Sequence, residues 1–181
     1  LVANERSRNR CNLLVANIQS HRSRVTIVSN HDGRLIPSLS GNSGYDAILV
    51  DAPCTGSGTT RKNPEVWSKW RPSGGLGLHS MQVGLLNRAV DLLRPGGRVV
   101  YSTCSLDPVE NEAVISQILQ RRGDVRLTDC SEMIEGVSIQ EGLQSWVPTD
   151  DDMQPLEGNP WAHPPSKEIS EKLSRCVRVR G

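Results

Sequence analysis

Short apolar runs and longer stretches of helical spacing alternate along this chain. Strands are expected at 1–3, 25–28, 47–50 and 98–102. Helices are expected at 8–19, 81–93 and 107–121. The first set is apolar or β-branched and bounded by turn residues, whereas the second places its apolar residues on one helical face. Strands that alternate with helices indicate βαβ units around a mainly parallel sheet, so the pattern predicts an α/β fold.

Two of the expected helices carry clear end signals. The helix at 81–93 has an apolar face from Val83 to Leu93 and is followed by Arg94-Pro95-Gly96-Gly97, which is typical of a helix end. The helix that opens at Asp107-Pro108 has Glu110 and Glu112 in its first turn. Negative charge there suits the helix dipole.

The remaining segments give weaker signals. The stretch from 60 to 78 is irregular, and 125–127 is expected to form a short strand. Residues 136–165 are rich in proline, glycine and acidic residues and predict an excursion loop. The alternation at 176–179 predicts an exposed edge strand.

Composition is that of an ordinary globular domain. The chain has 181 residues, 36% of them apolar and 23% charged, and a net charge of +1. Affinity for nucleic acid would therefore have to come from local basic patches. No apolar run approaches the roughly twenty residues that span a bilayer, and no signal sequence opens the chain, so an intracellular protein is expected. The five cysteines are scattered without a CxxC pair, which favours free thiols over disulfides or a zinc site.

Two cysteines follow expected strands. Asp51-Ala52-Pro53-Cys54 and Ser102-Thr103-Cys104-Ser105 each close an apolar run. Carboxyl ends of parallel strands line the ligand crevice, so Asp51, Cys54 and Cys104 are expected to converge on one substrate. A thiolate at Cys104 would be a nucleophile, although a buried packing role is the ordinary alternative for a cysteine.

Around these cysteines the chain resembles the Sun-domain (nucleolar-protein type) RNA cytosine-5 methyltransferases. The matching segments are Asp51 to Thr59, Arg61-Lys62-Asn63, Tyr101 to Leu106 and Glu110-Asn111-Glu112. Trp67, Trp70 and Asn30-His31-Asp32 are similar to the eukaryotic tRNA-modifying branch of that family. The resemblance implies a Rossmann-like, S-adenosylmethionine-dependent methyltransferase sheet with flanking helices.

The resemblance also implies a role for each matching residue. Cys104 would add to carbon 6 of cytosine, so that carbon 5 can accept the methyl group of S-adenosylmethionine. Asp51 would bind the polar edge of the base, and Cys54 would assist loss of the carbon 5 proton. The residues expected at the cofactor are Glu5, Asp32, Asp51 and Arg10. Most relatives carry Asp at the position of Glu5, where a carboxylate would accept both ribose hydroxyls.

RNA is the partner that the resemblance implies. The basic residues expected to hold it are Arg61, Lys62, Lys69 and Arg71. Transfer RNA is the expected substrate and ribosomal RNA the alternative, in a monomer without metal or membrane partners. The protein would be nuclear or nucleolar in a eukaryote and cytoplasmic otherwise.

The family pattern has a strand with a glycine-rich loop before the position of Leu1 and a further strand after that of Gly181. Residues 1–181 are therefore expected to be a single catalytic domain that is incomplete at both ends and binds S-adenosylmethionine poorly alone. A catalytically silent Rossmann-like module that binds RNA or acts as a scaffold is the leading alternative, because fold does not guarantee activity. A nucleotide hydrolase and a zinc deaminase are disfavoured, since the chain lacks a complete phosphate loop and a His/Cys/Cys cluster.

Overall fold

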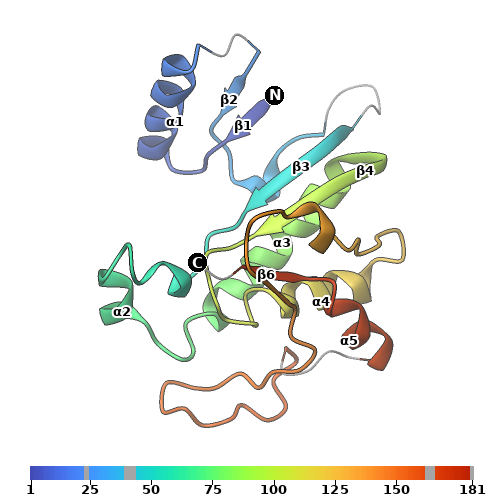
Figure 1. Cartoon of the computed structure of the whole chain (residues 1–181). Coiled ribbons are helices and arrows are strands. Elements are labelled where there is room, and N and C mark those ends of the chain that lie inside the picture. The colour runs from blue at the N-terminus through green and yellow to red at the C-terminus, as the bar shows by residue number, and fades with distance from the viewer. Residues whose placement is uncertain (23–24, 39–43, 162–165, 180–181) are drawn as a thin grey trace. The chain divides into compact units, whose positions relative to one another are not determined.

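The computed structural model describes residues 1–22, 25–38, 44–161 and 166–179 (Figure 1). They belong to two compact units. The first consists of Leu1–Ile48 and Arg88–Val99, and the second of Leu49–Asn87 and Val100–Gly181. Each unit is described by itself below.

The first unit begins with a strand, a helix and a second strand. Strand β1 (Val2–Asn4) pairs in parallel with β2 (Ile27–Ser29), and α1 (Arg8–Ser20) connects them. Half-buried Cys11, Leu14, Val15 and Ile18 share the helix face that the spacing predicts. The register aligns Asn4 with Ser29, so the carboxyl ends of both strands lie together.

Strand β3 (Tyr45–Asp51) pairs with β4 (Leu93–Ser102). The Ala52 N–H donates to the Ser102 carbonyl at one end, and Gly97 lies against the Tyr45 carbonyl at the other. The two strands therefore run in the same direction and end side by side. Strand β4 begins five residues before the expected position, because the chain becomes extended directly after the helix and Gly96 absorbs a turn at φ +77°.

Four helices are described from residue 65 onward. They are α2 (Glu65–Lys69), α3 (Leu76–Leu92), α4 (Glu112–Arg121) and α5 (Lys167–Leu173). Sequence reasoning missed α2 and began α3 five residues late. It also began α4 too early, since 108–111 form turns. None of the described helices is long and apolar enough to cross a membrane.

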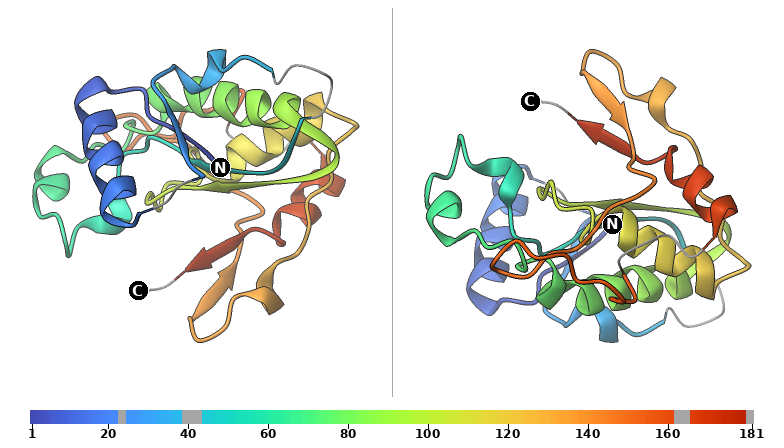
Figure 2. Two further views of the ribbon diagram at one scale, coloured as in Figure 1. Left: turned by 90° about the horizontal axis from the view of Figure 1, so that it is seen from above. Right: turned by 90° about the horizontal axis from the view of Figure 1, so that it is seen from below.

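A small antiparallel sheet joins two distant segments of the second unit. Strand β5 (Ile139–Glu141) pairs with β6 (Val177–Val179), and the right-hand view of Figure 2, from below, shows the two strands. The edge strand expected at 176–179 is confirmed, and the excursion loop at 136–165 contains β5. The strand expected at 125–127 is wrong: those residues are irregular, because a three-residue alternation has no pairing partner among the described strands.

The core of the second unit lies where α4 and α5 pack together. Val109, Ala113, Trp146 and Leu173 form a buried cluster. The Trp146 indole donates to the Trp161 carbonyl at 2.6 Å, which satisfies its polar atom inside the apolar cluster. This packing fixes the start of α4, next to the end of β4.

Candidate active site

The ends of β3 and β4 bring two sulfur atoms together. Cys54 lies three residues beyond β3 and Cys104 two residues beyond β4, and their Sγ atoms are 3.2 Å apart. Cys104 is exposed, whereas Cys54 is half-buried. Either sulfur can donate the hydrogen of this contact, so one thiol can stabilise the other as a thiolate.

Two glycines allow the loop after Cys54 to lie against Cys104. Gly56 has φ +74°, and a Cβ built on it would lie 3.9 Å from the Cys104 sulfur. The Gly58 N–H donates to the Cys104 carbonyl at 2.9 Å. A Cβ at Gly58 would lie only 2.9 Å from that same oxygen, so the backbones meet at a distance that only glycine permits.

Burial and the neighbouring sulfur change the acidity of Cys54. Burial is the larger cause and the hydrogen bond with Cys104 the second, and together they raise the pKa of Cys54 to about 11. Cys54 is therefore a neutral thiol near pH 7. It is suited to donate a hydrogen bond to its partner.

A buried carboxylate connects the residues that follow the two cysteines. Glu110 has no exposed surface, and it accepts hydrogen bonds from both Thr55 and Ser105. Gln82 donates to Glu110 and to the Pro53 carbonyl, each at 2.9 Å. Sequence reasoning placed Glu110 in the first turn of a helix, which is wrong, since α4 begins at Glu112. The only signal for its position was the Glu110-Asn111-Glu112 segment of the resemblance.

Asp51 is the last residue of β3 and is exposed. Its carboxylate has no hydrogen bond or ion pair with any residue that the structure describes. Its oxygens are therefore available to accept from the polar edge of a ligand.

Glu5 and Arg10 lie together in the first unit, at the end of β1. Glu5 Oε1 accepts from the Ser7 N–H at 2.7 Å and from Arg10 Nη2 at 2.9 Å. Burial would raise the pKa of Glu5, but these hydrogen bonds outweigh it and the pKa is lowered. The carboxylate is charged, and its second oxygen can accept from a hydroxyl group.

Asp32 follows β2 at the same end of the first unit. Its two oxygens accept from the Arg34 guanidinium, at 3.0 and 2.6 Å, and from the Arg34 N–H. The side-chain hydrogen bond from Arg34 is the main reason that the pKa of Asp32 is far below its usual range. Sequence reasoning missed Arg34, although its position two residues after an acidic residue in a turn was visible.

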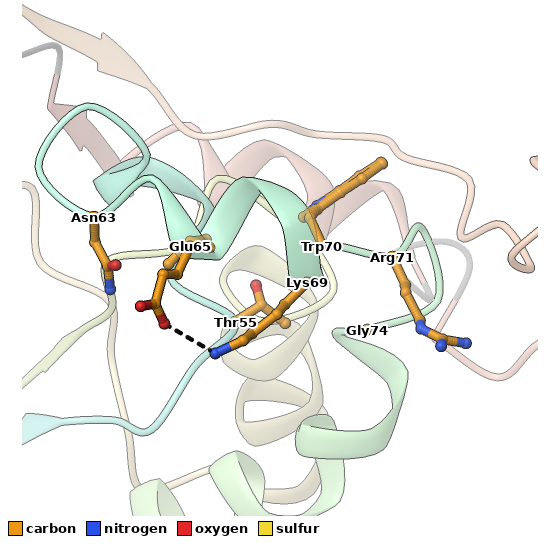
Figure 3. A pocket seen from close by; sticks show the side chains of 8 residues that line it. Thr55, Asn63, Glu65, Lys69, Trp70, Arg71 and Gly74 are labelled. Atoms are coloured by element: carbon orange, nitrogen blue, oxygen red, sulfur yellow. Dashed lines mark hydrogen bonds and ion pairs between the residues drawn. The ribbon is translucent and has the colours of Figure 1, made fainter.

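The four basic residues expected at RNA lie in and around α2. Arg61 and Lys62 are exposed. Lys69 pairs with Glu65 at 3.1 Å, and Arg71 pairs with Asp151 at 3.2 Å. Lys69 and Arg71 line a cavity of about 240 Å³ together with Thr55, Val66 and Trp70 (Figure 3). Thr55 connects this cavity to the cysteine loop.

No group of three His, Cys, Asp or Glu side chains within the described part of the chain could hold a metal ion. The groups near the two strand ends are the thiols of Cys54 and Cys104, the free carboxylate of Asp51 and the exposed cations Arg61 and Lys62. This set suits covalent chemistry on a polar, anionic substrate.

Comparisons with known proteins place the chain in a family. The chain is 39% identical to the multisite-specific tRNA:(cytosine-C(5))-methyltransferase of Saccharomyces cerevisiae, over 99% of this chain and 29% of that protein. It is 38% identical to the tRNA (cytosine(34)-C(5))-methyltransferase of Drosophila melanogaster, over 81% and 21%. The chain thus spans less than a third of the length of these curated relatives.

A solved structure shares the fold. NSun6 from Pyrococcus horikoshii, determined with the S-adenosylmethionine analogue SFG, matches with a TM-score of 0.59 and 30% identity, over 66% of this chain and 30% of that one. The expected α/β methyltransferase fold is therefore confirmed. Residues 1–156 match the family described as 16S rRNA methyltransferase RsmB/F. The chain belongs to this RsmB/F (Sun-domain) family of S-adenosylmethionine-dependent RNA cytosine-5 methyltransferases, as the sequence resemblance predicted.

Proposed function

We propose that this protein methylates carbon 5 of a cytosine in RNA, with tRNA as its substrate. The observation that carries the proposal is the 3.2 Å contact between the Cys54 and Cys104 sulfurs at the ends of adjacent parallel strands. Cytosine carbon 5 is a poor nucleophile until a group adds to carbon 6. One thiol to add and a second to assist release answer that requirement.

Cys104 is the nucleophile, because it is the exposed member of the pair. Its thiolate forms a bond to carbon 6, and the electron pair of the carbon 5–carbon 6 double bond becomes available at carbon 5. Asp51 accepts hydrogen bonds from the polar edge of the base and holds it during this addition. S-adenosylmethionine supplies the methyl group that carbon 5 accepts.

Cys54 acts after the methyl group has been accepted. While Cys104 is a free thiolate, its hydrogen bond with Cys54 contributes to the raised pKa of Cys54. The bond to carbon 6 removes that charge, so the pKa of Cys54 falls and its proton passes more easily to solvent. The Cys54 thiolate can then take the carbon 5 proton, and the electron pair of the broken carbon–hydrogen bond re-forms the carbon 5–carbon 6 double bond and expels the Cys104 sulfur as a thiolate.

Cofactor contacts are proposed for the carboxylates of the first unit. Glu5 and Asp32 follow β1 and β2, and both are charged. Asn4 Oδ1 accepts from the Ser29 hydroxyl and from the His31 N–H, which ties the loops of these carboxylates together. Carboxylate oxygens at the carboxyl ends of parallel strands fit the ribose and adenine side of S-adenosylmethionine.

The choice of RNA rests on the relatives. The yeast and fly relatives are named for modifying tRNA, whereas the family description names 16S ribosomal RNA. The match to the yeast protein covers 99% of this chain, whereas the family model covers residues 1–156, and this favours tRNA. Arg61, Lys62 and the cavity beside Thr55 would hold the strand, because exposed cations and aromatic rings are the usual contacts of single-stranded RNA.

Trapping experiments on the full-length protein test the reaction. With RNA that contains 5-azacytosine, the wild-type protein is expected to form an adduct that survives denaturation and is visible by mass spectrometry. Cys104→Ala should form none, whereas Cys54→Ala should retain the adduct on ordinary cytosine RNA and turn over about a hundredfold more slowly.

Bisulfite sequencing of RNA from cells with and without the protein identifies the substrate. Loss of methylated cytosines from tRNA supports the proposal, and loss from ribosomal RNA alone replaces tRNA by the alternative substrate. A wild-type protein that neither traps 5-azacytosine RNA nor changes any cytosine would be a silent RNA-binding module.

A further inference from the structure

Glu110 is a buried carboxylate that the reaction above does not use. It has no exposed surface and accepts four hydrogen bonds. Oε1 accepts from the Thr55 N–H at 3.0 Å and from the Gln82 amide at 2.9 Å. Oε2 accepts from the hydroxyl groups of Thr55 and Ser105. All four partners are donors, so both oxygens of the carboxylate are engaged.

These donors bracket the reactive sulfurs along the chain. Thr55 follows Cys54 directly, and Ser105 follows Cys104 directly. Gln82 also donates to the carbonyl of Pro53, the residue before Cys54. One carboxylate therefore connects the two turns that carry the sulfurs, although these turns are fifty residues apart in the sequence.

Fold stability alone does not explain a carboxylate at this position. Within the described residues Glu110 has no cationic partner, and all its donors are neutral groups. Burying an ionised carboxylate is costly unless it is paired or fully hydrogen-bonded, and apolar replacements of buried charges are often neutral or stabilising. Glu112, two residues later, is paired with the Arg178 guanidinium at 2.6 and 2.7 Å. The two buried glutamates thus have different environments.

We infer that Glu110 is a positioning residue: its carboxylate holds the turns after Cys54 and Cys104 together, so that both sulfurs face one base. The inference rests on the proposed function for its catalytic consequence. Its structural part, the spacing of the two thiols, can be measured without RNA.

The test compares Glu110→Gln with Glu112→Gln in the full-length protein. Each variant removes one buried carboxylate, Glu110 in the turn before α4 or Glu112 at its first residue. In Glu110→Gln one carboxylate oxygen becomes an NH₂ group, which cannot accept from its two donors. Glu112→Gln perturbs the ion pair with Arg178, which also donates to the Leu106 carbonyl at 3.0 Å, and the hydrogen bond from the Leu143 N–H. It leaves the donors to Glu110 in place.

Methyl transfer is the first readout. Glu110→Gln is expected to lower kcat about a hundredfold with little change in KM, because a misplacement of about 1 Å can cost that much. Glu112→Gln is expected to keep kcat per folded molecule within about twofold, since it touches no reactive group. Thermal denaturation of both variants gives the folded fraction.

Alkylation of the thiols is the readout that a purely structural role would not move. If the turns separate, Cys54 loses the hydrogen bond that helps to raise its pKa, and it should react faster in Glu110→Gln than in wild type. Cys176, whose pKa burial raises to about 12, should stay protected in Glu110→Gln, whereas Glu112→Gln removes the second cause of that raised pKa, the charge of Glu112. Mass spectrometry of the labelled peptides distinguishes the sites.

Equal losses of activity in the two variants, with Cys54 reactivity unchanged, would overturn the inference. A wild-type protein that transfers no methyl group would instead overturn the proposed function. The alkylation comparison would still decide whether Glu110 holds the two turns.

Discussion

Cys54 and Cys104 have different environments although their sulfurs are in contact. Cys104 is exposed, whereas Cys54 is half-buried beside it. Burial disfavours the thiolate, and hydrogen bonding to a second sulfur adds to the effect. The asymmetry suits the proposed roles, in which Cys104 attacks while Cys54 keeps its proton.

The raised pKa predicts slow alkylation of Cys54. A pKa of about 11 instead of the ordinary 9.0 lowers the thiolate fraction at pH 8 about a hundredfold, so Cys54 should react about a hundredfold more slowly than a peptide thiol. Its rate should rise with pH until about 11. Cys104→Ser should shift the profile to lower pH, because it removes part of the cause. A rate that levels off near pH 9 in wild type would contradict the raised pKa.

The place of Asp51, Cys54 and Cys104 at neighbouring strand ends could be predicted from the sequence, but the group that connects the cysteine turns could not. A proline and a cysteine directly after an apolar run mark a strand end, and this local signal placed Asp51, Cys54 and Cys104. The role of Glu110 depends on Thr55 and Gln82, which lie 55 and 28 residues away. No local pattern encodes such a contact.

Helices and strands with strong periodicity were predictable, and short or atypical ones were not. Helix α1 was predicted to within one residue at its end, because its apolar face repeats over three turns. Helix α2 has five residues and no apolar face long enough to detect. The early start of β4 was hidden by Arg94-Pro95-Gly96-Gly97, which is a stop signal for helices but here lies within extended chain.

The contact between the Cys54 loop and the end of β4 predicts that Gly58→Ala is harmful. The new Cβ would lie 2.9 Å from the Cys104 carbonyl oxygen, a backbone atom that cannot rotate away. The expected cost is about 1–3 kcal/mol of unfolding free energy, with methyl transfer reduced about tenfold or more as Cys104 shifts.

Gly77→Ala is the matched control for Gly58→Ala. Gly77 lies in α3, where a new Cβ meets nothing within 4 Å. This variant should gain about 0.5–1 kcal/mol, because alanine favours a helix over glycine, and it should keep full activity. Urea denaturation and a methyl-transfer assay measure both variants. If Gly58→Ala matched Gly77→Ala in both unfolding free energy and methyl transfer, the close approach at Gly58 would be refuted.

The cavity beside α2 predicts different roles for its two tryptophans. Trp70 lines the cavity, whereas Trp67 lies outside it and is 75% exposed. Trp70→Ala should weaken RNA binding about tenfold, since stacking of a base on an aromatic ring contributes about 1–3 kcal/mol. Trp67→Ala should change affinity less than about twofold. Fluorescence anisotropy with labelled tRNA measures both, and equal losses would exclude the cavity as the reason.

Over the whole chain, charge gives little attraction for RNA. The net charge is +1, so long-range attraction must come from cations that no carboxylate neutralises. Lys69 and Arg71 have acidic partners, Glu65 and Asp151. Arg61 and Lys62 have none among the described residues. They are therefore available to phosphate groups.

The double variant Arg61→Ala/Lys62→Ala should therefore weaken the salt dependence of RNA binding. Each lost contact to single-stranded RNA lowers the slope of log K against log salt by about 0.7, so two contacts give about 1.4. Lys167→Ala/Lys172→Ala removes the same charge from α5, where both lysines pair with glutamates, and should leave the slope unchanged. Anisotropy titrations across a salt series measure the slopes. If both double variants lower the slope equally, RNA senses total charge and the basic pair after the Cys54 loop has no special contact with phosphate.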